Sequence, residues 1–262
     1  MEYIALTKSQ NILKDNRYIF DASNVNAYRF NVPRGNNVSI VFINMKDNFE
    51  LSFDINDEAN VKLSFLQEKP LNLKITGQIL NNSILTCYYA DFTNGDINVN
   101  TNINLMNENA KCFWNLASLS KDSEKKAFDI SIYLKSKKTY CEINNYGVAR
   151  DNSRLYFSGI CKIIQGSHES IAHQNSKIMV FDEHSDAVAK PILKIDDNDI
   201  EASHAAVVGK ISDDHLFYLT SRGLSLNEAR ELITYGYLKP ILLGFDDEKM
   251  QETITSLIER GL

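Results

Sequence analysis

His204 lies in a run of small residues, ASHAAVVG, where its imidazole is the one side chain able to take up a proton near neutral pH. The neighbouring Ala202, Ala205 and Ala206 would let a second backbone approach this segment closely, as at an interface between chains. The ring could be packed, hydrogen-bonded or exposed. The residues alone therefore leave a structural and a chemical role open.

The other histidines lack the spacing of a metal site. In HESIAH, His168 and His173 are five residues apart, whereas the helical zinc-protease motif separates its histidines by four. On a strand, an odd separation sends the two rings to opposite faces, so we expect two unconnected strand or loop histidines. His184, in FDEHSD, is expected in a polar turn.

A group of acidic residues precedes His204. Asp197, Asp199 and Glu201 would share one face of a strand, and Asp196 lies beside them. Paired carboxylates can act as acid and base in the hydrolysis of glycans, so a stand-alone carbohydrate-active enzyme is one hypothesis. A solvated acidic face is the simpler interpretation.

The four cysteines are widely separated and lie among strand-like residues. Without a Cys-x-x-Cys pair they fit a zinc ribbon or a locally wrapped cluster poorly, so we expect buried core cysteines and no certain metal site. They are Cys87, Cys112, Cys141 and Cys161. The chain also lacks the GxxxxGK[ST] and GxGxxG phosphate-binding loops, so any dependence on ATP must come from another chain.

The composition argues against two classes of partner. A net charge of −6 disfavours nucleic acid and anionic lipid surfaces. No apolar run approaches the roughly 20 residues of a membrane span, and the beginning of the chain is too polar for a signal peptide. We expect a cytoplasmic protein that binds neither nucleic acid nor membrane.

Hydrophobic residues alternate with polar ones over most of residues 18–211. Three clear runs begin at Phe49, Ile97 and Phe128, and short breaks rich in Asn, Asp, Lys and Gly separate them. Strands that recur at roughly ten- to twelve-residue intervals predict a sandwich, a barrel or a β-solenoid. The abundance of Asn and the near-regular repeat favour a parallel β-helix. Residues 1–17 form a short lead, expected to be a tail or a covering segment.

Residues 212–262 change to a helical pattern. Ser212 is expected to cap a first helix that stops at Gly223, and Ser225 with Glu228 forms a capping box for a second. Asp246 is expected to cap a last helix. These short helices carry more apolar surface than they need, so either they pack on the β body or they meet a partner.

A family resemblance becomes specific from about residue 140. The segments NNYGVARDNSRLYFSGICKIIQGSHESIAHQNSKIMVFDEHSDAVAKPILKI and NDIEASHAAVVGKISDDHLFYLTSRGLSLNEA resemble the C-terminal part of the SufB/SufD proteins of iron–sulfur cluster assembly, more closely the SufD branch. The resemblance implies a right-handed parallel β-helix followed by a short C-terminal helical segment. It implies a non-enzymatic scaffold subunit of a SufBCD-type complex.

The resemblance also implies particular roles and partners. His204 falls on the SufD histidine implicated at the junction with SufB, where a transient cluster could form. A SufB-like cysteine is replaced near Ser185, and Ser203 and Ala205 stand where SufB has glutamate beside the histidine. The chain alone should therefore bind no cluster or cofactor stably. The longer, largely helical N-terminal region of the family is reduced here to the short lead.

Two surfaces follow for partners. The last strands would bind a SufB-like subunit or a second copy of the chain. The helical segment would dock a SufC-like ABC ATPase, with candidate contacts at Tyr218, Arg222, Tyr235 and Tyr237. A homodimeric scaffold for a lone ABC-type ATPase is the remaining alternative.

Overall fold

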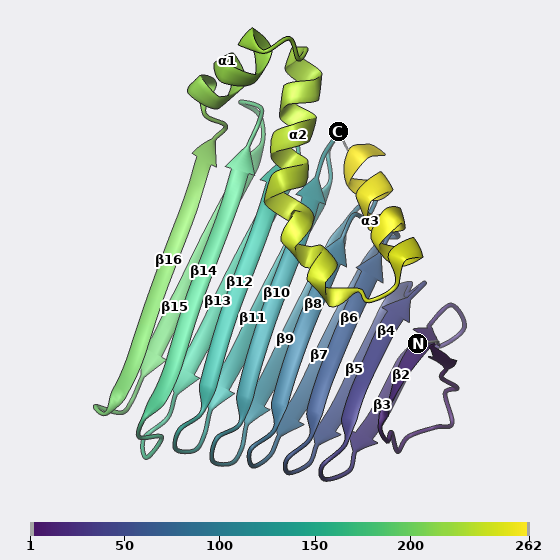
Figure 1. The fold of residues 1–262 in the computed structure, drawn as a ribbon. Helices are drawn as coiled ribbons and strands as arrows, with labels where there is room; N and C mark the ends of the chain where they lie inside the picture. The colour runs from purple at the N-terminus through teal and green to yellow at the C-terminus, as the bar shows by residue number, and fades with distance from the viewer. Residues whose placement is uncertain (1–2, 261–262) are drawn as a thin grey trace.

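The structure, a computed structural model that describes residues 3–260, is a parallel β-helix with a helical segment along one side (Figure 1). The predicted mainly-β fold, a parallel β-helix with a short C-terminal helical segment, is confirmed. The strands are β1 (Ile4–Ala5), β2 (Asn16–Asp21), β3 (Ala27–Val32), β4 (Asn37–Ile43), β5 (Asp47–Ile55), β6 (Asn60–Gln67), β7 (Leu71–Ile79), β8 (Ile84–Asp91), β9 (Ile97–Leu105), β10 (Lys111–Ser120), β11 (Lys125–Leu134), β12 (Tyr140–Ala149), β13 (Arg154–Ile163), β14 (Ser170–Val180), β15 (Asp186–Ile195) and β16 (Ile200–Lys210).

From β2 onward, successive strands alternate between two parallel sheets. Within the described residues, one sheet holds nine strands in the order β1-β2-β4-β6-β8-β10-β12-β14-β16, and the other holds seven in the order β15-β13-β11-β9-β7-β5-β3. The rungs lengthen along the chain: Tyr18 pairs with Ile40, 22 residues on, whereas Ile143 pairs with Gln174, 31 residues on. The strand order also shows that each rung pairs with the rung before it and the rung after it, as in other solenoids.

The inward residues of every strand form one continuous core. Along the nine-stranded sheet, Phe42, Phe65, Tyr89 and Trp114 stack with ring centroids 5.0 to 6.3 Å apart. All four side chains are essentially excluded from water. Aromatic rings in offset stacks stabilise a core beyond the area that they bury, so this column links four consecutive rungs.

The polar breaks between strands form stacked turns at one end of the β-helix. In the turns before β6, β8, β10, β12 and β14, one non-glycine residue adopts a left-handed conformation. Its N–H donates to a carbonyl of the next turn, as Asn82 N does to Glu108 O at 3.0 Å and Lys138 N to His168 O at 2.9 Å. Asn tolerates this conformation, while Lys and Glu adopt it at a cost. The left-handed residues in this column are Glu58, Asn82, Asn109, Lys138 and Glu169.

The helical segment contains α1 (Asp213–Ser221), α2 (Leu226–Leu238), a 3₁₀ helix (Lys239–Gly244) and α3 (Glu248–Arg260). The capping box of Ser225 and Glu228 is present as predicted. Ser212 has the backbone geometry of a cap without a side-chain bond. The cap predicted at Asp246 is wrong: Asp247 Oδ1 accepts from Met250 N at 3.0 Å, because Asp246 is drawn into an ion pair with Lys62 at 2.7 Å.

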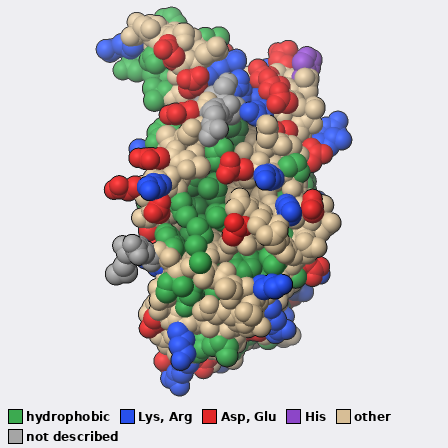
Figure 2. All heavy atoms as spheres, turned by 90° about the vertical axis from the view of Figure 1, so that its right-hand side faces the viewer, with side chains coloured by type: hydrophobic (Ala, Val, Ile, Leu, Met, Phe, Trp, Pro, Cys, Tyr) green, Lys and Arg blue, Asp and Glu red, His purple; other side chains and the backbone are tan. Residues whose placement is uncertain are grey.

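The helices pack against the outer face of the nine-stranded sheet. Outward positions there are apolar and pack with the helical residues Leu238, Ile241, Phe245, Ile254 and Ile258 in a second core. The 3₁₀ helix comes so close that a Cβ on Gly244 would meet Tyr88 at 2.4 Å, and Ser64 Oγ donates to Gly244 O at 2.6 Å. The packing explains much of the helices' apolar surface. Figure 2 shows hydrophobic side chains among charged ones on the side of the molecule near the N-terminus.

The lead covers the first rung. β1 pairs with β2, Ile12 forms a bridge with Asn31, and Leu6 and Leu13 are buried in the core. None of the described helices is long and apolar enough to cross a membrane.

Candidate functional site

The last rung leaves the C-terminal end of the β-helix uncovered. β15 and β16 are the terminal strands of their sheets, so each has one edge with backbone N–H and C=O groups that no neighbouring strand pairs among residues 3–260. Large apolar side chains lie exposed on this rung: Val188 at 42%, Ile195 at 42%, Val207 at 55% and Val208 at 44%. A long open edge with exposed apolar side chains is a template for a further strand.

His204 lies on this open rung. In the parallel register His204 lies beside Gln174 of β14, just as Ala202 lies beside the buried Ala172. His204 is therefore on the side of the sheet that faces the interior. Its ring is exposed because no rung lies above it, and no hydrogen bond from the ring is made within the described part of the chain. The imidazole is therefore available to a partner.

The residues below His204 are tightly placed. Gln174 Nε2 donates to Ile192 O in the opposite sheet at 2.9 Å. A Cβ on Gly159 would lie 2.4 Å from Gln174 Oε1, so a larger residue there would displace this amide from its bond to Ile192. Gln174 thus bridges the two sheets immediately beneath the open end.

Next to the edge, the outer face carries a group of polar side chains around His173. The sequence did not indicate that these residues lie together. His173 Nδ1 lies 2.7 Å from Ser203 Oγ, and its Nε2 lies 3.7 Å from Glu201 Oε1. Tyr140 donates to Glu142 Oε2 at 2.8 Å, and burial followed by this bond raises the pKa of Tyr140 to about 12. Only the parallel register brings these residues together, so no local motif could have revealed them.

The acidic residues before His204 do not share a strand face, so that prediction is wrong. Asp197 lies in the turn before β16 and is nearly buried. Its carboxylate accepts from the N–H groups of Asp199 at 3.0 Å and Gly166 at 2.8 Å, and it pairs with His168 Nδ1 at 3.0 Å. The Asp199 bond, ahead of the Gly166 and His168 bonds, lowers the pKa of Asp197. The carboxylate therefore serves to cap the backbone of a turn. His168 lies in the turn before β14, which agrees with the expected strand or loop position.

The cysteines are buried, as predicted. Cys141 and Cys161 face each other across the two sheets with their sulfur atoms 3.1 Å apart, and burial raises the pKa of the Cys141 thiol. Across residues 3–260, no three His, Cys, Asp or Glu side chains gather as metal ligands. Ser185 lies in the turn after β14, where its hydroxyl donates to Asp151 O at 3.1 Å.

The helical segment divides into packed and exposed parts. α1 projects beyond the strands (Figure 1), buries no residue, and leaves Phe217 74% and Tyr218 57% exposed. Arg222 lies over the Tyr218 ring at 5.3 Å. Tyr235 and Tyr237 are half-buried, and the Tyr237 ring contacts Tyr146 of β12 at 5.5 Å. Tyr218 and Arg222 thus lie at the surface, whereas Tyr237 packs on the β body.

Several known proteins are similar to this chain in sequence. Residues 37–237 match the family described as SUF system FeS cluster assembly, SufBD core domain. The chain is 38% identical over 118 residues to the iron–sulfur cluster assembly protein SufD of Bacillus subtilis. The matched stretch covers 45% of this chain and 27% of the Bacillus protein. It is 25% identical over 218 residues to the SufD of Escherichia coli, covering 80% of this chain and 51% of that protein.

A third relative, a SufBD family protein of Methanothermobacter thermautotrophicus, is 31% identical over 122 residues, or 47% of this chain and 29% of that protein. The chain thus spans about half or less of the length of these relatives. The family match covers well over half of the chain and includes the strand that carries His204. The chain therefore belongs to the SufB/SufD family of iron–sulfur cluster assembly proteins and is close to SufD.

Proposed function

We propose that this chain is a SufD-type scaffold subunit of a SufBCD-like assembly complex in the cytoplasm. It works without catalysing a reaction itself: the open edge of β15 and β16 binds a SufB-like subunit, and the helical segment docks a SufC-like ATPase. The observation that carries the proposal is the uncovered last rung, with His204 and four exposed apolar side chains beside unpaired strand edges.

The edge suits a partner with strands of similar length. β16 offers 11 residues and β15 offers 10, so a β-helix with a matching open end would continue both sheets. Pairing would place His204 in the dry centre of the junction. A nascent cluster, as the cargo of the complex, would receive this imidazole as one ligand and the others from the partner.

The ATPase surface is α1. A helix that buries none of its residues yet exposes Phe217 and Tyr218 has no packing reason to be apolar. The pair of Tyr218 and Arg222 combines an aromatic ring with a cation, which is typical of the residues that dominate protein interfaces.

The test is light scattering after size exclusion, with this chain mixed with the SufB-like and SufC-like proteins of its host. Val207→Asp should abolish assembly with the SufB-like subunit and leave ATPase binding intact. Phe217→Asp should abolish binding of the ATPase and leave assembly with the SufB-like subunit intact. Ile12→Asp is the matched control, because Ile12 is 63% exposed in the lead that covers the first rung, at the other end of the β-helix.

The outcomes separate the alternatives. A complex with the ATPase alone, in which this chain pairs with itself and Val207→Asp breaks the pair, would favour the homodimeric scaffold. Assembly that is indifferent to Val207→Asp would refute the edge as the interface. If the chain binds neither protein, a screen of glycan hydrolysis tests the carbohydrate hypothesis.

A further inference from the structure

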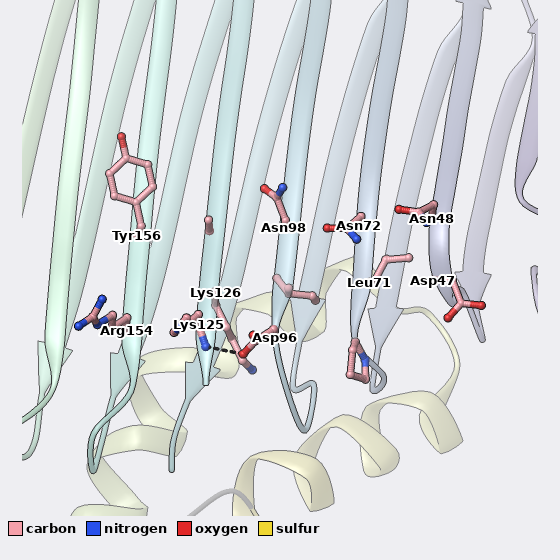
Figure 3. Close-up of a pocket in the computed structure, with 13 residues that line it drawn as sticks. Asp47, Asn48, Leu71, Asn72, Asp96, Asn98, Lys125, Lys126, Arg154 and Tyr156 are labelled. Carbon is pink, nitrogen blue, oxygen red and sulfur yellow. Dashed lines mark hydrogen bonds between the residues drawn. The ribbon is translucent and has the colours of Figure 1, made fainter. Parts of the chain in front are cut away.

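The outer face of the seven-stranded sheet holds a groove that the assembly role does not use. The helices pack on the other sheet, so this face is open. A hollow of about 660 Å³ runs across β5, β7, β9, β11 and β13 near the start of each strand (Figure 3). Cavities of this size are typical of small-molecule sites.

The side chains of one register row explain the hollow. Asn48, Asn72 and Asn98 follow one another on adjacent strands, and Ala127 and Tyr156 continue the same row. Figure 3 shows the three amides in line and Tyr156 at the end of the groove. Ala127 is too short to fill its place in the row, so a gap is left between the amide of Asn98 and the phenol ring.

Two cations flank that gap. Lys125 and Arg154 are directly opposed on adjacent strands, and both are exposed. Like charges opposed in a sheet repel. Among residues 3–260 neither side chain forms an ion pair within 4 Å, although Asp96 lies close by and accepts from the Lys125 backbone N–H at 2.8 Å. Asp186 is the register partner of Arg154 on β15, so the two cations lie between Asp96 and Asp186 without an ion pair to either.

Two further charged residues of the groove, Lys126 and Asp47, are engaged or distant. Lys126 turns inward and pairs with Asp91 at 3.3 Å and Glu124 at 3.4 Å. Asp47 lies at the opposite end from Arg154 (Figure 3). The carboxylates nearest to an anion at this end are therefore Asp96, which lines the groove, and Asp186, the register partner of Arg154.

We propose that the groove binds a small molecule through an oxyanion, a phosphate or a carboxylate, held between Lys125 and Arg154. A planar guanidinium and a neighbouring ammonium suit such a group. The body of the ligand lies in the gap over Ala127, against the Tyr156 ring, and its polar atoms meet the amide of Asn98. Pro70 and Ile97 also line the groove, so the ligand has an apolar or ring portion.

The test is calorimetric titration of the full chain at low ionic strength with three probes: pyrophosphate, citrate and AMP. Lys125→Gln with Arg154→Gln should weaken binding at least tenfold, and Ala127→Phe should block AMP by filling the gap. Lys194→Gln is the matched control, because Lys194 is also exposed on this sheet but at the far end of β15. The control should bind as the unchanged protein does.

Each result bears on the proposal. Binding of pyrophosphate and AMP but not citrate assigns the site to phosphates, and the reverse assigns it to carboxylates. Lys125→Gln should also leave the melting temperature nearly unchanged, because it removes the repulsion from Arg154 together with the attraction to the nearby Asp96. Failure of all three probes to bind at millimolar concentration would overturn the proposal, as would binding that both the double variant and Ala127→Phe leave intact.

Discussion

Lys126 is a buried charged residue of the β-helix, and we expect its replacement to destabilise the fold strongly. Its ammonium is fully buried, donates to the carbonyls of Thr93 at 2.8 Å and Leu119 at 2.6 Å, and pairs with Asp91 and Glu124. We expect Lys126→Met to leave two buried carboxylates with no cation between them. Removing one partner of a buried ion pair costs about 3–5 kcal/mol.

The assay is chemical denaturation followed by circular dichroism. A loss of that size corresponds to a factor of about 10² to 10³ or more in the unfolding equilibrium, and to a fall in melting temperature of about 6–20 °C in a domain of this size. Lys125→Met is the matched control, because the adjacent lysine is exposed, and surface changes usually stay within about 0.5 kcal/mol.

A second variant separates the charge from the shape of the side chain. Adding Asp91→Asn and Glu124→Gln to Lys126→Met removes the uncompensated charges and should recover a large part of the loss. If Lys126→Met costs no more than Lys125→Met, the reasoning that this triad is a closed, desolvated unit is refuted.

Three further outcomes are expected. Gly159→Ala should destabilise the fold by about 1–3 kcal/mol in denaturation, because its Cβ would lie 2.4 Å from Gln174 Oε1; Gly209→Ala, which meets nothing within 4 Å, should be neutral, and equal losses would contradict the packing argument. Asp197 has a lowered pKa, so its stabilisation is present above the ordinary carboxyl pKa and is lost as pH falls through the lowered value. The melting temperature of Asp197→Asn should therefore fall less steeply between pH 5 and about pH 2 than that of the unchanged protein, and parallel curves would argue against it. His204→Ala should leave the melting temperature of the isolated chain unchanged, since the ring has no hydrogen bond in residues 3–260, and a clear loss would indicate a structural histidine.

The strands were predictable because their pattern is local. Alternation such as that from Phe128 through Ile132 follows from one face being buried, whatever the neighbouring rung contains. The capping box at Ser225 was predictable for the same reason, since all of its partners lie within four residues. The family resemblance pointed to the open rung that carries His204.

The misplaced residues depend on distant partners. Asp197 was assigned to a strand, but the backbone of the preceding turn and His168, one rung away, hold it. Asp246 was assigned as a helix cap, but it forms an ion pair with Lys62, a residue far from it in the sequence. Lys126 occupies an inward position that alternation alone would reserve for an apolar side chain. Such contacts are set by the register between rungs, which no short motif encodes.

The column of stacked turns is left unfinished at the last rung. Each turn donates its N–H to the following turn, so every rung needs its successor to satisfy that group. The last turn, before β16, has no successor in the described chain. A partner that docks there would continue the column, because its backbone carbonyls could accept from the N–H groups of this last turn.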